Sequence, residues 1–178
     1  MADRLLDREL LERAFALLSR KLARRRVVGE LHVFGGAAMV LAYDARAATR
    51  DVDALFRPDG PVLEAASEVA NELGLPRSWL NNQAGSYVSG RAGRGTPVYD
   101  DPNLRVLITP PEHLLAMKVR AARAVRDADD LRLLLKALDL RALDEVVEVV
   151  GRFFPDEPLS ERSRQLVEDL IAERADPV

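Results

Sequence analysis

Two glycines and two aspartates in the first third of the chain are the residues best suited to chemistry. Gly35 and Gly36 follow the apolar run Leu31–Phe34, and fourteen residues separate them from Asp51 and Asp53. Glycines at a strand-to-helix turn let a ligand approach the main chain, and free N–H groups at a helix start favour an anion such as a triphosphate. Alternation along a strand puts both carboxylates on one face, where they can hold Mg²⁺. This order predicts a phosphate cradle followed by a metal site.

Each half of this pattern also has a simpler explanation. Gly35 and Gly36 can form a plain turn, and Asp51 and Asp53 can belong to a solvated strand end. Together and in this order they favour function, because phosphoryl and nucleotidyl transfer need a bound phosphate next to a metal ion.

The elements that must position these residues are read from the apolar pattern. Around the candidate site we expect a strand at Leu31–Phe34, a helix at Ala37–Tyr43 and a strand at Asp51–Phe56. A further strand is expected at Leu104–Ile108, and helices at Arg4–Arg24, Pro61–Leu73, Pro111–Val125, Asp127–Leu138, Leu140–Phe153 and Ser160–Arg174. Glycines and prolines break the pattern of Leu75–Asp101, where Trp79–Val88 is interpreted as an irregular or edge segment and Gly90–Thr96 as a loop near the substrate.

These elements predict an α/β (α+β) fold in which a small mixed sheet, flanked by helices, is followed by a helical C-terminal part. At 178 residues we expect one domain over 1–178, with a sheet-containing core at 1–109 and the helical part at 110–178.

Composition narrows the chemistry. The absence of cysteine excludes disulfides and thiolate metal sites, and two histidines make a zinc centre a poor match. No apolar window is long enough to span a membrane, and the N-terminus does not resemble a secretory signal, so we expect a cytoplasmic protein. The net charge of −3 is not that of a general polyanion binder, although arginines cluster around Arg20–Arg26, Arg91–Arg94 and Arg120–Arg126. These clusters suit nucleic-acid phosphates or, equally, solvated helix faces.

The glycine and aspartate motifs resemble the signature of the nucleotidyltransferase superfamily, the polymerase β-like fold. With Arg46 and Thr49 included, the pattern resembles the AbiEii/MenT-type nucleotidyltransferase toxins and their uncharacterised bacterial relatives. The later residues Lys118, Arg126-Asp127 and Asp130-Leu131 resemble the lysine and the Arg-Asp-x-x-Asp-Leu motif that complete the active site of that group. The resemblance covers about Leu31 to Leu138.

Lys118 is unusual without any resemblance. It falls on the apolar stripe of its helix, and lysine is almost never fully buried unless it is paired. It can meet a phosphate in a cleft, extend along an apolar face, or pair internally with Asp127 or Asp130.

Asp127 and Asp130 are three residues apart, so they share one side of a helix, and each can also be a helix N-cap. The resemblance favours Asp127 for the active site, and Asp130 with Arg126 for holding the helices together. One uninterrupted helix would point Lys118 and Asp127 in opposite directions, so we expect a break near Ala124–Arg126.

The third acid that many superfamily members place on a later strand is missing from Leu104–Ile108. Asp100 and Asp101 lie just before that strand and can replace it or simply form a turn.

The resemblance implies an Mg²⁺-dependent (or Mn²⁺-dependent) enzyme that moves an NMP from an NTP to an acceptor. The implied acceptor is RNA, such as a tRNA 3′ end, in a bacterial toxin with a cognate antitoxin. The implied catalytic residues are Asp51, Asp53, Lys118 and Asp127, with Asp51 and Asp53 on the metal; the nucleotide-binding residues are Gly35, Gly36, Arg46, Thr49 and Arg50. Asp53 and Asp127 both remain candidates for activating the acceptor hydroxyl. The alternatives are a catalytically silent antitoxin or regulatory module, and a transferase acting on a small molecule such as an antibiotic.

Overall fold

The computed structural model describes residues 5–44, 46–83, 85, 88, 93–121 and 124–175, of which 124–126 and 175 by their backbone only. Within these ranges the strands are β1 Leu6–Asp7, β2 Gly29–Phe34, β3 Ala48–Thr49, β4 Val52–Arg57, β5 Leu80–Asn81, β6 Thr96–Asp101 and β7 Leu104–Ile108. The helices are α1 Arg8–Arg24, α2 Gly35–Tyr43, α3 Asp59–Leu73, α4 Pro111–Ala121, α5 Ala124–Ala137, α6 Leu143–Phe153 and α7 Glu161–Ala175.

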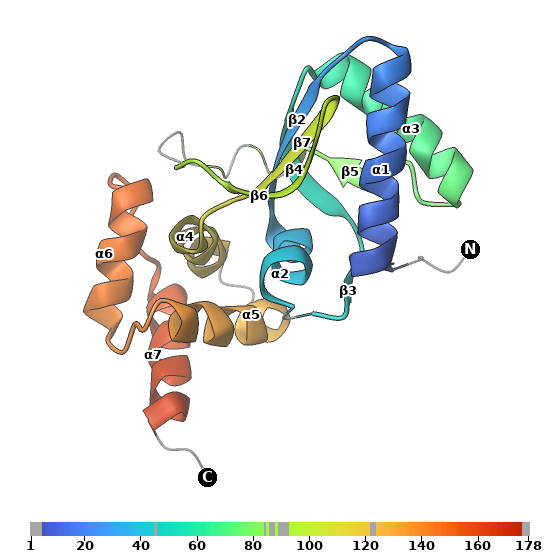
Figure 1. Ribbon diagram of the computed structural model, residues 1–178. Coiled ribbons are helices and arrows are strands. Elements are labelled where there is room, and N and C mark those ends of the chain that lie inside the picture. The colour runs from blue at the N-terminus through green and yellow to red at the C-terminus, as the bar shows by residue number, and fades with distance from the viewer. Residues whose placement is uncertain are drawn as a thin grey trace. The chain divides into compact units, whose positions relative to one another are not determined.

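The chain divides into two compact units (Figure 1). The sheet unit is Met1–Ser86 with Gly95–Thr109, and the helical unit is Tyr87–Arg94 with Pro110–Val178. None of the helices in the described ranges combines the length and the apolar character needed to cross a bilayer. The expected α/β class is confirmed.

A five-stranded mixed sheet forms the centre of the sheet unit, with strand order β5-β4-β2-β7-β6. β2 runs antiparallel to β4 and parallel to β7, while β5 is parallel to β4. A separate two-stranded ladder pairs β1 with β3.

One face of this sheet carries the core. Leu31 and Val33 of β2 are buried on the same face as Gly29, where a Cβ on the glycine would lie 2.8 Å from Leu22 of α1 and 3.5 Å from Val62 of α3. α1 and α3 therefore cover this face, as Figure 1 shows. The opposite face is more polar, because alternation places there the half-buried Glu30 and His32 of β2.

α2 follows β2 without a loop and closes one end of the sheet. Five consecutive residues, Ala37 to Leu41, are buried, as expected for a helix that is apolar all round. Its C-terminal carbonyls are satisfied by Arg8, whose guanidinium donates to Val40 O at 2.8 Å and to Leu41 O at 3.1 Å.

The helical unit is built on apolar stripes. Val146, Val149 and Val150 form the buried stripe of α6, which packs on α4. The His113 ring of α4 stacks on Phe153 with 4.7 Å between ring centroids, and burial lowers the pKa of this histidine.

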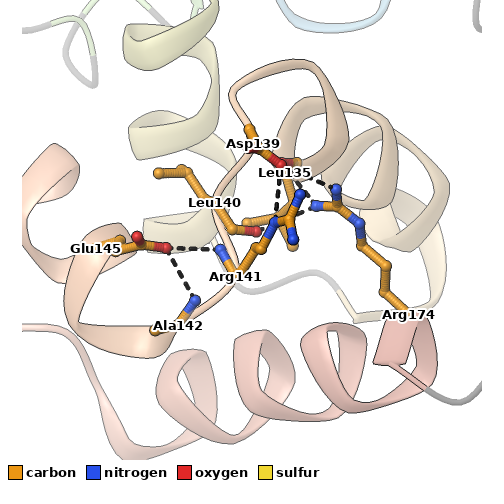
Figure 2. A network of polar contacts seen from close by, with 7 residues as sticks. All are labelled: Leu135, Asp139, Leu140, Arg141, Ala142, Glu145 and Arg174. Atoms are coloured by element: carbon orange, nitrogen blue, oxygen red, sulfur yellow. Dashed lines mark hydrogen bonds and ion pairs between the residues drawn. The ribbon is translucent and has the colours of Figure 1, made fainter.

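A polar network fastens the connection that follows α5 (Figure 2). Arg174 of α7 donates to the carbonyls of Leu135 and Leu140, at 3.2 Å each, and pairs with Asp139 at 3.3 Å. The Leu135 carbonyl also accepts the Leu140 N–H at 3.0 Å, so Arg174 ties α7 to a turn that is itself hydrogen-bonded. Glu145 accepts the backbone N–H groups of Arg141 and Ala142 at the start of α6.

The structure corrects the predicted boundaries in a few places. α1 begins at Arg8 because Asp7 caps it, its carboxylate accepting the Leu10 N–H at 2.8 Å. α3 begins at Asp59, before Pro61, and ends at Leu73 with Gly74 as its C-cap, as predicted. α6 begins at Leu143, three residues later than Leu140.

The largest omission is β6, which falls inside a segment predicted to be irregular. β6 is stabilised by pairing with β7, although Pro97 and the neighbouring glycines interrupt any strand pattern in its sequence. The register of this pairing shifts between Pro97 and Tyr99. Of the predicted Gly90–Thr96 loop, residues 90–92 lie outside the described ranges, 93–95 have no regular structure, and Thr96 begins β6.

Candidate active site

The side chain of Asp53, a residue of β4, lies next to the start of α2. In the ladder between β2 and β4 it is opposite Phe34, the last residue before Gly35. A Cβ on Gly35 would lie 3.0 Å from Asp53 Oδ2, and Gly35 has φ +66°, in the region that favours glycine. The Asp53 carboxylate therefore lies next to the N–H groups at the start of α2. The sequence predicted a metal ion next to a phosphate at this position.

Gly36 makes an equally close approach on its other side. A Cβ here would lie 2.6 Å from Thr49 Oγ1 and 3.7 Å from an Arg46 guanidinium nitrogen. Thr49 is buried and donates its hydroxyl to the Asp51 carbonyl at 3.2 Å. The loop through β3 is thus held against the first turn of α2, and no side chain larger than hydrogen fits at Gly36 without a shift.

Asp51 immediately precedes β4 and is half-buried, like Asp53, while Val52 between them is fully buried. The alternation predicted for the two aspartates is confirmed by this burial pattern. Both carboxylates therefore point away from the core face of the sheet.

One further member of the site is absent from the predictions. Asn81 of β5 is opposite Asp53 in the β4–β5 ladder, and its amide nitrogen lies 3.5 Å from Asp51 Oδ2. Only 8% of Asn81 is exposed. The segment around it was interpreted as irregular or as an edge, and a two-residue strand carries no periodic signal that could reveal its register.

We call this group the Gly–Asp cluster; its members are Gly35, Gly36, Arg46, Thr49, Asp51, Asp53 and Asn81. Arg50, which was predicted to bind the nucleotide, is exposed in the turn before β4.

The donor set of the cluster fits a magnesium ion that keeps ligands from a substrate. Within the described ranges, no three histidine, cysteine, aspartate or glutamate side chains group as metal ligands. Asp51 and Asp53 supply two carboxylates, and Mg²⁺ is usually held by one or two carboxylates together with substrate phosphates. Because Gly35 and Gly36 lack a Cβ, the Asp53 carboxylate and the Thr49 hydroxyl approach the first turn of α2 closely.

The strand order gives Asp53 a different neighbour from the strand Leu104–Ile108, in which no acid was found. β7 pairs with β2 and β6, whereas the strand next to Asp53 is β5. Asp100 and Asp101 do not replace the missing acid, because the β2–β7 and β6–β7 registers align them with Gly29 and Glu30, at the end of β2 away from Phe34.

Asp101 instead organises the turn into β7. It accepts hydrogen bonds from Ser19 Oγ and Tyr99 OH at 2.7 Å each, and from the N–H groups of Asn103 and Leu104. Burial opposes its charge, but these hydrogen bonds outweigh burial and hold the pKa of Asp101 below its ordinary value. Burial, followed by the bond to Asp101, raises the pKa of Tyr99 to about 12.

The second predicted group forms within the helical unit. Lys118 Nζ lies 2.9 Å from Asp127 Oδ1 and 2.7 Å from Asp130 Oδ2. The exposed fractions are 8% for Lys118, 7% for Asp127 and 0% for Asp130. We call these three residues the lysine triad. Of the three interpretations of Lys118, internal pairing describes this structure.

Lys118 and Asp127 would face opposite ways along one uninterrupted helix, so their contact at 2.9 Å requires a change of helix direction between them, as predicted. Residues 124–126, where this change was predicted, belong to α5, and residues 122 and 123 lie outside the described ranges. Neither aspartate is an N-cap, because α5 starts before both of them. Asp130 joins α5 to α4 as expected, while the Arg126 side chain lies outside the described residues.

Two residues of the basic cluster at the end of α1 pair with acids of α3. Lys21 pairs with Glu72 at 2.7 Å, and Arg25 pairs with Glu68. Arg20, Arg24 and Arg26 are exposed. A groove of about 820 Å³ near the start of α3 is lined by Val28, Glu30, Leu55, Phe56, Arg57, Pro58, Asp59 and Asn82, none of which was predicted to act.

Comparison with known proteins gives one result. No curated protein and no solved structure matched this chain. A family model matches residues 9–170, a span that contains the Gly–Asp cluster and the lysine triad. The chain therefore belongs to the family described as "Nucleotidyltransferase of unknown function" (DUF6036).

Proposed function

We propose that this protein transfers an NMP from an NTP to an acceptor in a reaction that depends on Mg²⁺ or Mn²⁺. The observation that carries the proposal is the position of Asp53 Oδ2, 3.0 Å from where a Cβ on Gly35 would be. A helix start suited to a phosphate and a carboxylate suited to a cation are adjacent there, and the family supports a nucleotide substrate.

In this proposal the backbone N–H groups at Gly35 and Gly36 bind the triphosphate. Arg46, whose guanidinium is close to Gly36, and the exposed Arg50 add positive charge. Asp51 and Asp53 hold the cation, which when bound neutralises the phosphate charge and polarises the reacting phosphorus. Such a transfer needs positioning and charge stabilisation and no nucleophilic side chain of the protein.

The resemblance also assigns Lys118 and Asp127 to the reaction. Lys118 already contacts two carboxylates within 3 Å and only 8% of the residue is exposed, so little of its ammonium is open to a phosphate. We therefore propose that the lysine triad supports activity by holding α4 to α5. Asp53 is accordingly our candidate for activating the acceptor hydroxyl, in addition to its role on the cation.

For the acceptor we propose RNA, with a tRNA 3′ end as the first candidate, in a toxin of the AbiEii/MenT type. The support is the resemblance of the motifs together with the exposed Arg20, Arg24 and Arg26. A second function is favoured by one observation: the strand beside Asp53 carries Asn81 and no third carboxylate. This favours a catalytically silent regulatory module.

The test is incubation with each labelled NTP, Mg²⁺ and total RNA, with the products separated into RNA and small molecules. Asp53→Asn removes the charge of a proposed metal ligand, and Asp100→Asn makes the same change on an exposed aspartate paired with Arg105. We expect labelled RNA from wild type and Asp100→Asn, and a loss on the order of 100-fold or more from Asp53→Asn.

Label in a small molecule would replace RNA as the acceptor. No label from any NTP, with NTP still bound, would establish the silent module. Equal labelling by Asp53→Asn and wild type would contradict the proposed site.

A further inference from the structure

The side chain of Asn81 lies next to the two aspartates of the Gly–Asp cluster. It is opposite Asp53 along the β4–β5 ladder, and its amide nitrogen is the atom that approaches Asp51 Oδ2, at 3.5 Å. This separation is at the long end for a hydrogen bond, so the contact guides the carboxylate without holding it tightly.

The orientation of the Asn81 amide follows from its other neighbours. Its oxygen accepts the Gln83 N–H at 3.0 Å, and its nitrogen also lies 3.5 Å from the Ser78 carbonyl. The oxygen is therefore committed to a donor, and the nitrogen is placed between two acceptors. Exchanging the two amide atoms would put oxygen against oxygen on one side and N–H against N–H on the other.

The side-chain N–H group that Asn81 directs at Asp51 cannot bind a cation. It supplies a positive partial charge that lowers the repulsion between Asp51 and Asp53 when no metal is bound. A carboxylate in the same position would add a third ligand and a further negative charge, and both raise the affinity for a divalent cation.

We propose that Asn81 is a positioning residue that orients the Asp51 carboxylate, and that the protein alone binds a divalent cation weakly and acquires it together with the nucleotide. The proposal rests on the metal site of the proposed function and adds the source of the remaining ligands, which are the phosphates of the substrate. Asn81 itself does not touch the cation.

The test replaces Asn81→Asp and uses Asn82→Asp as the matched control, because Asn82 is the next residue and is exposed. Mn²⁺ is titrated by calorimetry into nucleotide-free protein, and thermal unfolding is followed in EDTA and in Mn²⁺. For Asn81→Asp we expect about tenfold tighter Mn²⁺ binding than wild type, from one added carboxylate ligand. We also expect a lower midpoint in EDTA that Mn²⁺ restores, and neither change for Asn82→Asp.

A purely structural role for Asn81 would make Asn81→Asp equally unstable in EDTA and in Mn²⁺, and that result would overturn the proposal. Wild-type protein that binds Mn²⁺ as tightly alone as with a non-hydrolysable NTP analogue would do the same. Neither measurement needs turnover, so a failed transfer assay and a failed metal assay remain separate outcomes.

Discussion

Replacing Lys118 by methionine tests the lysine triad most directly. Methionine keeps much of the length of the side chain and removes the ammonium that contacts Asp127 at 2.9 Å and Asp130 at 2.7 Å. Both carboxylates would remain buried, because only 7% of Asp127 and 0% of Asp130 are exposed. The change therefore removes the cation that Lys118 contributes and leaves the packing nearly intact.

The expected cost follows from that burial. Removing one partner of a buried ion pair destabilises a protein by about 3–5 kcal/mol, because a charge remains buried without that partner. Asp127 and Asp130 have further contacts, so we expect the lower end, about 3 kcal/mol. In a protein of this size about 3 kcal/mol corresponds to a fall in Tm of roughly 6–12 °C.

Urea denaturation followed by far-UV circular dichroism measures this loss. Lys136→Met is the matched control, because Lys136 is an exposed lysine on α5. The single tryptophan, Trp79, is buried in the sheet unit, so its fluorescence follows that unit separately. Adding Asp127→Asn and Asp130→Asn to Lys118→Met removes the buried charges, so the triple variant should regain part of the lost stability.

Two outcomes would refute this reasoning. A cost for Lys118→Met no larger than that for Lys136→Met would mean that the triad contributes nothing measurable. A triple variant less stable than Lys118→Met alone would mean that the buried carboxylates are not the source of the cost.

Two further predictions concern the sheet unit. Gly35 and Gly74 have nearly equal φ, +66° and +65°, but a Cβ on Gly35 meets Asp53 while one on Gly74 meets nothing within 4 Å. In thermal unfolding we expect Gly74→Ala to cost about 1 kcal/mol from strain alone and Gly35→Ala at least about 1 kcal/mol more; equal costs would contradict the close contact. Ser19→Ala removes a hydrogen bond that lowers the pKa of Asp101, and such a depressed pKa stabilises the fold above the ordinary pKa of aspartate. The variant should therefore be about 1–2 kcal/mol less stable than wild type at neutral pH, and the gap should close as pH falls through the folded-state pKa; a gap independent of pH would show that the charge of Asp101 is not involved.

The sequence predicted much of this fold because its elements carry strong local signals. The apolar stripe before Arg24, the Gly74 helix end and the four helices after Pro110 follow from periodicity and from residues that end helices. β6 and the two-residue β1 and β3 were not predicted, because short strands are stabilised by their partners and have no periodicity of their own. β5 is an edge strand within the segment that was interpreted as irregular or as an edge.

The sequence by itself also determined which residues could do the chemistry. Gly35, Gly36, Asp51 and Asp53 were identified by residue type, spacing and strand alternation, and Lys118 by being a charge on an apolar stripe. These are local properties, and the structure places Asp53 next to Gly35.

Only the tertiary structure decided what those residues contact. The strand order puts β5 beside β4, so Asn81 of β5 lies next to Asp53. β7, the strand in which no third acid was found, lies on the other side of β2. The way α4 and α5 pack lets Lys118 meet Asp127 and Asp130, a choice that helical spacing left open. Both outcomes depend on segments distant in the chain packing together, and local propensity carries no information about such contacts.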